Sequence, residues 1–413
     1  MQAKRVKYSI IIPVKNSLKY LPECIYSIIR QDYLNYELII SDDHSEDGTV
    51  EYLNTLHHQN IKIIHPPKHF TVTEHYDFAI RNVTGEWLIC VGSDDGLQPY
   101  FFKLADILTD IAVKNNIRAI GSRRAYYYWD GCQEVWGNSM IRYSANLSKK
   151  YKIKYSKFEI IKTLLGYRDS GYHSLPQMYT TSLFHHSLID EAKKKQNGKI
   201  LTAAFPDVNL AIISTTIEKK FIESNIPFGW VGTSPRSVFR DENILRDIRK
   251  TPFICGNFDL MSKEIWFWGY LLTLSELRDI KTNKIIASKL FISLMFGNIL
   301  SRMILNYIFK RLKKEKFVLR KKLLYEVIQI NKCYYFIIIF IVILLFLPNS
   351  LYFFFKLLNS LFYKLSSKMG SKTHLSLRLR RTKNKNITMT DASNRVLPLI
   401  KSIFEKKVTY NKT

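Results

Sequence analysis

Cysteine is scarce in this chain, and its five cysteines stand far apart. They are Cys24, Cys90, Cys132, Cys255 and Cys333, and no two of them form a CxxC pair. Disulfide frameworks and cysteine-based zinc sites both need characteristic cysteine spacings. The sequence therefore argues against both, and we expect a reducing compartment.

A secretion signal is also lacking at the N-terminus. Residues 1–7 are basic, but the apolar run that follows them extends only over Ile10–Pro13. A signal peptide needs an apolar core of about 7–15 residues. We therefore expect the first domain to stay in the cytoplasm.

Acidic residues are few, and the shortage is concentrated in the last third of the chain. The 413 residues contain 62 Lys/Arg and 35 Asp/Glu, a net charge of +27, and residues 281–413 hold 27 Lys/Arg against 4 Asp/Glu. A basic chain raises nucleic acid as a partner. No known nucleic-acid-binding motif and no repeated basic and aromatic pattern is present, so we expect no nucleic-acid partner.

Short apolar strands alternate with amphipathic helices in the first hundred or so residues of a chain that is 46% hydrophobic. This alternation predicts a parallel α/β sheet, with Asn16 or Ser17 capping the first helix. The predicted strands are residues 9–14, 37–41, 61–65 and 86–91, and the predicted helices are residues 18–29, 49–56 and 73–81.

Pairs of aspartates follow two of the predicted strands. Asp42 and Asp43 end the second strand, and Asp94 and Asp95 follow the fourth. Ligands of parallel α/β sheets bind beyond the carboxyl ends of the strands. Carboxylates there suit Mg²⁺ or Mn²⁺, which neutralises a bound diphosphate. Aspartate and glycine after a strand are also ordinary turn residues, but the joint placement of the two pairs favours a site.

Three segments together resemble the nucleotide-binding half of glycosyltransferase family 2. They are SIIIPVKN at residues 9–16, ELIISDDHSEDGT at 37–49 and TGEWLICVGSDDGLQP at 84–99. The resemblance implies a GT-A fold, which is Rossmann-like with a mostly parallel sheet. It also implies a nucleotide-sugar donor, with UDP favoured, a divalent metal, and inversion at the anomeric carbon.

The resemblance assigns roles by position. Pro13 would border the nucleobase, Asp42 would bind the base, and Asp43 would lie near the ribose. Asp94 and Asp95 would hold Mn²⁺ or Mg²⁺ together with the ribose or the diphosphate.

One acidic position of the family pattern is missing here. The commonest pattern has an aspartate where this chain has Gly92, and a variant pattern has one at the position of Ser93. This departure puts strict metal dependence in doubt, although two carboxylates remain.

An inverting transfer needs a general base that deprotonates the acceptor hydroxyl. Asp207 is the best candidate between residues 201 and 240, because it opens an apolar helical stretch and its Pro-Asp-Val context resembles related transferases. An acid near a helix N-terminus is also favoured for structural reasons. Arg236, in the polar loop 232–237, would counter phosphate charge, although a surface turn explains that loop nearly as well.

Histidines and aromatics between these motifs are less informative. Nothing in the spacing of His173, His185 and His186 selects a metal ligand, and the adjacent pair points to different faces of a helix or strand. The aromatic residues 126–129 and Trp136 would stack on sugar rings, but a half-buried strand explains them better.

The last third of the chain indicates a membrane. Residues 333–347 are uncharged and apolar, and residues 351–355 continue the run after a Pro-Asn-Ser break. Nine Lys/Arg flank this run on each side, in residues 310–332 and 356–385. A re-entrant hairpin that keeps both flanks cytoplasmic satisfies the positive-inside rule, and one tilted span remains the alternative.

The segment before this run is apolar and then strongly basic. Residues 285–322 would lie on an anionic leaflet, or would pack on the catalytic domain with a solvated basic face. Residues 366–413 are polar and basic without a clear apolar period, and we expect an adaptable tail.

Together these features predict three regions: a GT-A domain at residues 1–250, a helical basic amphipathic region at 251–330, and a hydrophobic membrane segment with a basic tail at 331–413. The predicted function is inverting sugar transfer from a nucleotide sugar to a lipid-linked or other glycan acceptor at the cytoplasmic face of a bacterial inner membrane. The alternative is an inactive membrane scaffold that binds nucleotide sugar. A processive synthase is disfavoured because the chain lacks a Gln-x-x-Arg-Trp motif.

Overall fold

The computed structural model describes residues 6–132, 139–146, 150–164, 174–202, 206–236, 374–380 and 387–405. The chain divides into two compact units. The first unit comprises Met1–Ser156, Leu175–Thr251 and Lys372–Thr413, and the second comprises Lys157–Ser174 and Pro252–Ser371. The only described element of the second unit is α5 (Ser156–Leu164).

An eight-stranded sheet forms the centre of the first unit. In spatial order its strands are β3 (Ile61–Ile64), β2 (Tyr36–Asp42), β1 (Tyr8–Val14), β4 (Trp87–Cys90), β10 (Ser182–His185), β6 (Ala119–Ser122), β11 (Lys220–Ser224) and β9 (Tyr151–Tyr155).

The first four strands of this sheet confirm the predicted α/β pattern. β3, β2, β1 and β4 are parallel neighbours, and the apolar residues of β1, such as Ile10 and Ile12, are fully buried. Runs buried on both faces are typical of parallel sheets. The sheet as a whole is mixed, because β10 is antiparallel to both β4 and β6, and β9 is antiparallel to β11.

A second sheet of five strands belongs to the same unit. In spatial order it contains β13 (His374–Arg380), β8 (Ser139–Asn146), β7 (Ala125–Tyr128), β12 (Gly229–Thr233) and β5 (Gly96–Leu97).

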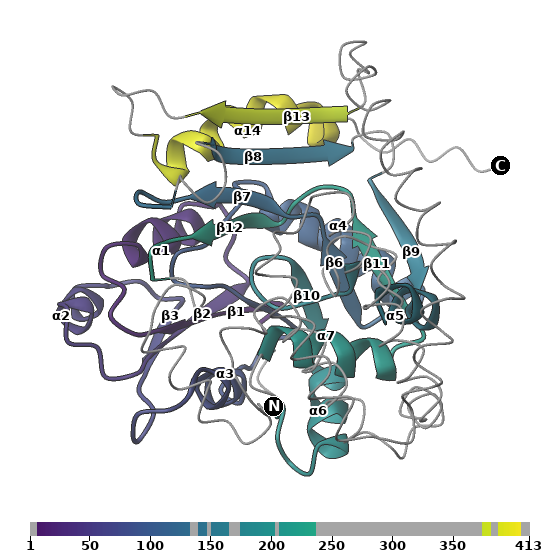
Figure 1. Ribbon diagram of the computed structural model, residues 1–413, viewed down its shortest axis with the longest axis horizontal. Helices are drawn as coiled ribbons and strands as arrows, with labels where there is room; N and C mark the ends of the chain where they lie inside the picture. Colours follow the sequence, from purple (N-terminus) through teal and green to yellow (C-terminus); the bar gives the residue numbers. More distant parts are fainter. Residues whose placement is uncertain are drawn as a thin grey trace, which may run out of the picture. The chain divides into compact units, whose positions relative to one another are not determined.

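Helices lie on both sides of the eight-stranded sheet (Figure 1). α3 packs against β1, β2 and α7, and α7 packs against α6, whereas α4 packs against β6 and β11. The helices described in the first unit are α1 (Leu21–Ile29), α2 (Thr49–Asn54), α3 (Val72–Ile80), α4 (Phe101–Lys114), α6 (His186–Lys195), α7 (Pro206–Ile217) and α14 (Met389–Glu405).

The cap predicted for the first helix is wrong. α1 begins at Leu21, and its N-cap, Tyr20, makes no side-chain capping bond. Asn16 lies in the left-handed region with a φ of 50°, and its side-chain oxygen accepts the N–H of Glu46 at 2.6 Å. Asn16 therefore joins two loops instead of capping a helix.

The C-terminal residues of the chain return to this unit. β13 pairs antiparallel with β8, and α14 contributes Met389, Ala392, Val396 and Ile400 to the buried core. Figure 1 shows both elements beside β8. The expectation of an adaptable tail is therefore wrong for residues 374–380 and 387–405.

The membrane prediction concerns other residues. Among the described helices, none combines the length and the apolar character that crossing a bilayer requires. The apolar run 333–355 and the basic segment 285–322 lie outside the described residues, as do His173 and Trp136.

Candidate functional site

The two aspartate pairs meet at one edge of the eight-stranded sheet. β1 pairs in parallel with β2 on one side and with β4 on the other, so the carboxyl ends of all three strands lie together. Asp42 ends β2, and the loop after β4 carries Asp94 and Asp95. Pro13 is half-buried near the end of β1, opposite Ser41.

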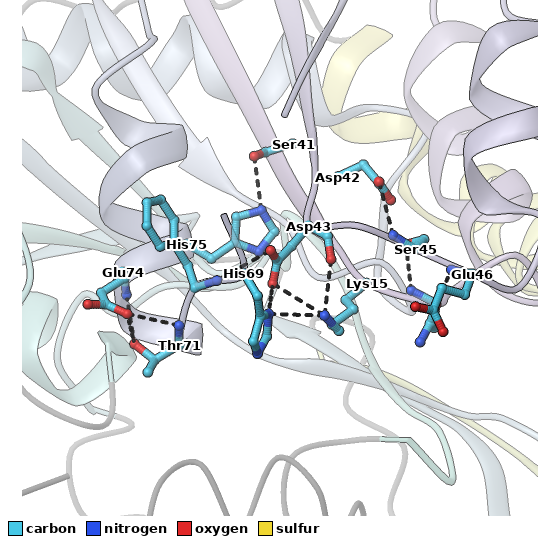
Figure 2. Close-up of polar contacts among 12 residues, drawn as sticks. Lys15, Ser41, Asp42, Asp43, Ser45, Glu46, His69, Thr71, Glu74 and His75 are labelled. Carbon is cyan, nitrogen blue, oxygen red and sulfur yellow. Dashed lines mark hydrogen bonds and ion pairs between the residues drawn. The ribbon is translucent and has the colours of Figure 1, made fainter. Parts of the chain in front are cut away.

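The carboxylate of Asp43 is enclosed by three donors (Figure 2). One oxygen lies 2.6 Å from Nδ1 of His69 and 3.7 Å from Nζ of Lys15. The other accepts the N–H of Phe70 at 3.3 Å. Asp43 is 1% exposed, whereas the two basic side chains are half-exposed. Lys15 and His69 thus form a basic rim over a buried acid.

Asp42 retains an acceptor atom without a partner. Its Oδ2 accepts the N–H of Ser45 at 3.2 Å and lies 3.7 Å from Nδ1 of His65. Its Oδ1 is buried and makes no hydrogen bond. An unsatisfied buried acceptor is costly, so a ligand N–H that reached this oxygen would be stabilised.

His75 supports this end of β2 from α3. Its Nε2 lies 2.9 Å from Oγ of Ser41, and burial lowers its pKa to about 4 against the opposing effect of the Asp43 charge. The ring is therefore neutral at pH 7. The capping box of Thr71 and Glu74, which starts α3, fixes the approach of the loop that carries His69.

Asn16 connects three loops of the site. Its N–H donates to Oγ of Ser45 at 2.7 Å, and its carbonyl oxygen accepts a hydrogen bond from Nη1 of Arg236. Arg236 therefore lies at the edge occupied by the aspartates. Arg236 and Asp94 both act on Tyr20, whose pKa is raised by burial and then by Asp94 and is lowered by Arg236.

Asp95 holds two backbone segments together. Its Oδ2 accepts the N–H of Gly92 at 2.8 Å, and its Oδ1 accepts the N–H of Gly232 at 2.6 Å. The residue is 3% exposed. Burial and the neighbouring Asp94 raise the pKa of Asp95, and the two amide bonds oppose that shift. Asp95 thus joins the loop after β4 to β12.

Asp94 is the more accessible acid of this pair, since it is only half-buried. A single carboxylate together with donor phosphates and water fits the coordination that Mg²⁺ adopts. Within the described residues, no group of three or more His, Cys, Asp and Glu side chains is arranged to hold a metal. Asp94 could therefore hold a cation together with oxygen atoms of a bound ligand and of water.

Asp207 lies within electrostatic range of a tyrosine of this region. It is 4% exposed in the first turn of α7. After the effect of burial, the charges of Asp207 and Asp95 both raise the pKa of Tyr179. The Tyr179 ring meets the ring of Tyr76 edge-on, at 5.8 Å between centroids. Tyr179 thus lies within electrostatic range of both Asp207 and Asp95.

Tyr179 also has an unusual backbone. Its φ is 59°, a left-handed conformation that is rare for a bulky residue and that accumulates at functional sites. Neither tyrosine could be identified as a site residue from the sequence. No local motif marks them, and Lys15, His69 and His75 were missed for the same reason.

The remaining candidates lie elsewhere or are structural. His185 ends β10 and packs against Trp87, and His186 lies 3.5 Å from Asp190 on α6. Tyr127 and Tyr128 are buried in β7, as expected for a half-buried strand. Trp129 donates from Nε1 to the carbonyl oxygen of Asp94 at 2.7 Å, which supports the loop.

A methyl group at Gly232 should distort the site. A Cβ there would overlap the carbonyl oxygen of Asp94, which is backbone and can move only with its loop. We expect Gly232→Ala to lower the free energy of unfolding by about 1–3 kcal/mol, as measured by thermal unfolding. Gly121→Ala is the matched control, because its Cβ would meet Pro176 at an ordinary 3.5 Å. Equal effects of the two substitutions would contradict this account.

Comparison with known proteins identifies the N-terminal part. The sequence pattern of "Glycosyl transferase family 2" matches residues 9–174. Glycosyltransferase GlyG of Streptococcus pneumoniae is 32% identical over 21% of this chain and 30% of its own. The GalNAc(5)-diNAcBac-PP-undecaprenol beta-1,3-glucosyltransferase of Campylobacter jejuni is 28% identical over 36% of this chain and 43% of its own. The matches thus span less than half of either relative.

A solved structure of S. aureus TarS 1-349 in complex with UDP-GlcNAc overlays on 78% of this chain and 92% of its own, with 14% identity and a TM-score of 0.46. A TM-score this low carries no part of the assignment. Two observations support the likeness to this family. The parallel pairing of β1 with β2 and β4 brings the two aspartate pairs to one edge of the sheet. Residues 9–174 of this chain match the sequence pattern of glycosyl transferase family 2.

Proposed function

We propose that the chain is an inverting glycosyltransferase that moves a sugar from a nucleotide-sugar donor to a glycan acceptor. The observation that carries this proposal is the meeting of Asp42, Asp43 and Asp94 at the carboxyl ends of adjacent parallel strands in a chain that matches the pattern of this family. Such an edge is where α/β sheets bind nucleotides.

The donor base would lie at the ends of β1 and β2. The unpartnered Oδ1 of Asp42 is suited to accept an N–H of the base. Pro13 borders this position, and Asp43 with its basic rim would lie near the ribose. A UDP-sugar is the donor we favour.

The diphosphate would lie between the loop after β4 and the end of β12. Asp94 would hold Mn²⁺ or Mg²⁺, and Asp95 would position that loop through its two amide hydrogen bonds. A bound cation would neutralise the charge of the leaving diphosphate. Arg236, exposed at the same edge, would add positive charge from the protein itself.

Asp207 would act as the general base. It lies in the first turn of α7, and a carboxylate there would accept the proton of the acceptor. The acceptor hydroxyl would lose its proton to Asp207 as its oxygen bonds to the anomeric carbon. The bond from that carbon to the diphosphate oxygen breaks in the same step, so the configuration inverts.

The proposed acceptor is a lipid-linked glycan in surface polysaccharide, capsule or lipopolysaccharide synthesis. The apolar and basic residues 285–355 support a position at the cytoplasmic face of a bacterial inner membrane. The name of the Campylobacter relative includes a glycan on PP-undecaprenol, which supports the same acceptor class.

Binding and hydrolysis of a panel of nucleotide sugars, with Mn²⁺, Mg²⁺ or EDTA, test this function. Cation-dependent hydrolysis of one donor is the expected result. Binding without turnover in the presence of membrane acceptors would favour the inactive scaffold. No binding of any donor would contradict both the transferase and the scaffold that binds nucleotide sugar.

Asp94→Ala should weaken donor binding in the presence of Mn²⁺ by about 10- to 100-fold, the usual value of a hydrogen-bonded charged contact. Titration calorimetry with and without EDTA measures the change. Asp110→Ala removes an acid from the solvent face of α4, where the side chain is 68% exposed, and should leave binding unchanged. If Asp94→Ala binds donor as tightly as this control, Asp94 is not a ligand.

A further inference from the structure

The strand β9 carries a half-exposed apolar face at the edge of the eight-stranded sheet. Tyr151, Ile153 and Tyr155 alternate along it and are 39%, 38% and 55% exposed. Side chains two residues apart in a strand share one face, so the three form one stripe. The other large apolar side chains exposed among the described residues of this unit lie on α1, α4, α14 and the loop before β2, and such scattered exposure needs no explanation.

The lysines on the opposite face of β9 already form ion pairs within the sheet. Lys152 and Lys154 both pair with Glu223 of β11, Lys152 at 2.7 Å, and Lys154 is 7% exposed. On the stripe side, Ile222 lies opposite Ile153 in the ladder and is fully buried. On this face of the sheet, the apolar side chain of β11 is therefore buried, whereas that of the neighbouring strand β9 is half-exposed.

Uncompensated positive charge frames the stripe. Lys219 and Lys220 are exposed at the start of β11, and Nζ of Lys220 lies 5.3 Å from the ring centroid of Tyr155. Lys150 precedes the other end of the stripe. Glu223 lies opposite Lys152 in the ladder and is bound to Lys152 and Lys154. The stripe thus combines tyrosine rings and an isoleucine with lysines at both ends.

We propose that this β9 face, consisting of Tyr151, Ile153, Tyr155 and Lys220 with Lys150 and Lys219 beside its ends, binds the surface of an anionic lipid bilayer. Tyrosine and lysine both place an apolar body against acyl chains and a polar tip among headgroups. Lysines near an anionic leaflet add electrostatic attraction. Edge-to-edge pairing with a second copy fits less well, because lysines on an edge strand oppose strand pairing.

This surface is distinct from residues 285–355, on which the membrane position of the proposed function rests. It lies within the unit that contains the aspartates. Binding through β9 would hold the catalytic unit itself against the leaflet, where a lipid-linked acceptor is presented.

A fluorescent label at Ile153 tests the contact. The full chain with Ile153→Cys, and with Cys255 and Cys333 replaced by serine, carries an environment-sensitive dye, because Cys24, Cys90 and Cys132 are buried. The vesicles contain phosphatidylglycerol and phosphatidylcholine with brominated acyl chains, which quench a dye that enters the bilayer. Leu34→Cys is the matched control, since Leu34 is 75% exposed beside β2, toward the other end of the strand order.

Quenching at position 153 but not at position 34 is the expected result. Vesicle binding with no quenching at 153 would overturn the β9 contact and leave the membrane position of the proposed function intact. Absence of vesicle binding would overturn both. Nucleotide-sugar hydrolysis in solution tests the transferase separately.

Removal of charge gives a second measurement. Each of the substitutions Lys219→Gln and Lys220→Gln should weaken partitioning onto phosphatidylglycerol vesicles by about fivefold, with no change on pure phosphatidylcholine. Lys103→Gln, an exposed lysine on α4, should change neither. Unchanged partitioning of the double variant onto anionic vesicles would contradict the proposal.

Discussion

Val396→Asp should unfold the catalytic unit, although only 17 residues of the sequence follow position 396. Val396 is fully buried in α14 and belongs to the core cluster shared with the central sheet. An unpaired charge at such a position costs about 3–5 kcal/mol, a large part of the stability of an ordinary domain. Thermal unfolding monitored by circular dichroism measures the loss.

Asn394→Asp is the matched control for this prediction. It introduces the same charge two residues earlier in the same helix, where the side chain is exposed. The expected change in stability is within about 0.5 kcal/mol. A similar small change for Val396→Asp would show that α14 does not belong to the core.

A chain that ends at residue 373 gives the complementary result. It loses the hydrogen bond from Nε1 of Trp230 to Oγ of Ser393 and that from the Tyr127 hydroxyl to the carbonyl oxygen of Ile387, each 2.8 Å long. It also leaves β8 without its partner β13. We expect this chain to aggregate, because both large rings are buried in the complete unit.

The N-terminal strands could be predicted from the sequence because they are local signals. The run Ile10–Ile12 is buried on both faces in a parallel sheet, so it is apolar throughout and ends at proline. The strand ends then placed Asp42 and Asp94 at the same edge without any knowledge of side-chain contacts. Parallel pairing makes that edge common to all the strands involved.

The C-terminal elements were missed for identifiable reasons. Leu375, Leu377 and Leu379 alternate with polar residues in β13, a strand pattern that the basic composition masked. Pro398 lies inside α14 and reads as a helix breaker. The partner of β13 is β8, more than 200 residues earlier in the chain, and no local pattern specifies such a pairing.

The partners of the site aspartates depend on tertiary structure in the same way. His69 reaches Asp43 because the β3–α3 loop folds back over the end of β2. Tyr179 lies near Asp207 because the segment before β10 adopts a left-handed turn there. The spacing of residues in the sequence predicts neither of these contacts. It does predict that the aspartates lie at the ends of the strands.

Asp207→Asn should abolish sugar transfer while leaving the donor bound. The amide matches the carboxylate in shape but cannot take the acceptor proton, and a general base contributes about 10²–10⁴-fold to rate. We therefore expect kcat to fall by about that factor, with a donor dissociation constant close to that of the unchanged chain. Single-turnover transfer to a membrane acceptor fraction and titration calorimetry measure the two quantities.

Asp190→Asn provides the control on a neighbouring helix. Asp190 lies on α6, is 54% exposed and is paired only loosely with His186 at 3.5 Å, so its substitution should change neither rate nor binding.

The competing explanation is that Asp207 merely stabilises the N-terminus of α7. In that case Asp207→Asn would lower the midpoint of thermal unfolding and leave kcat nearly unchanged, because asparagine loses only the favourable charge at the helix end. A large fall in kcat at an unchanged unfolding midpoint would therefore show that Asp207 acts as the general base and does not merely stabilise the helix.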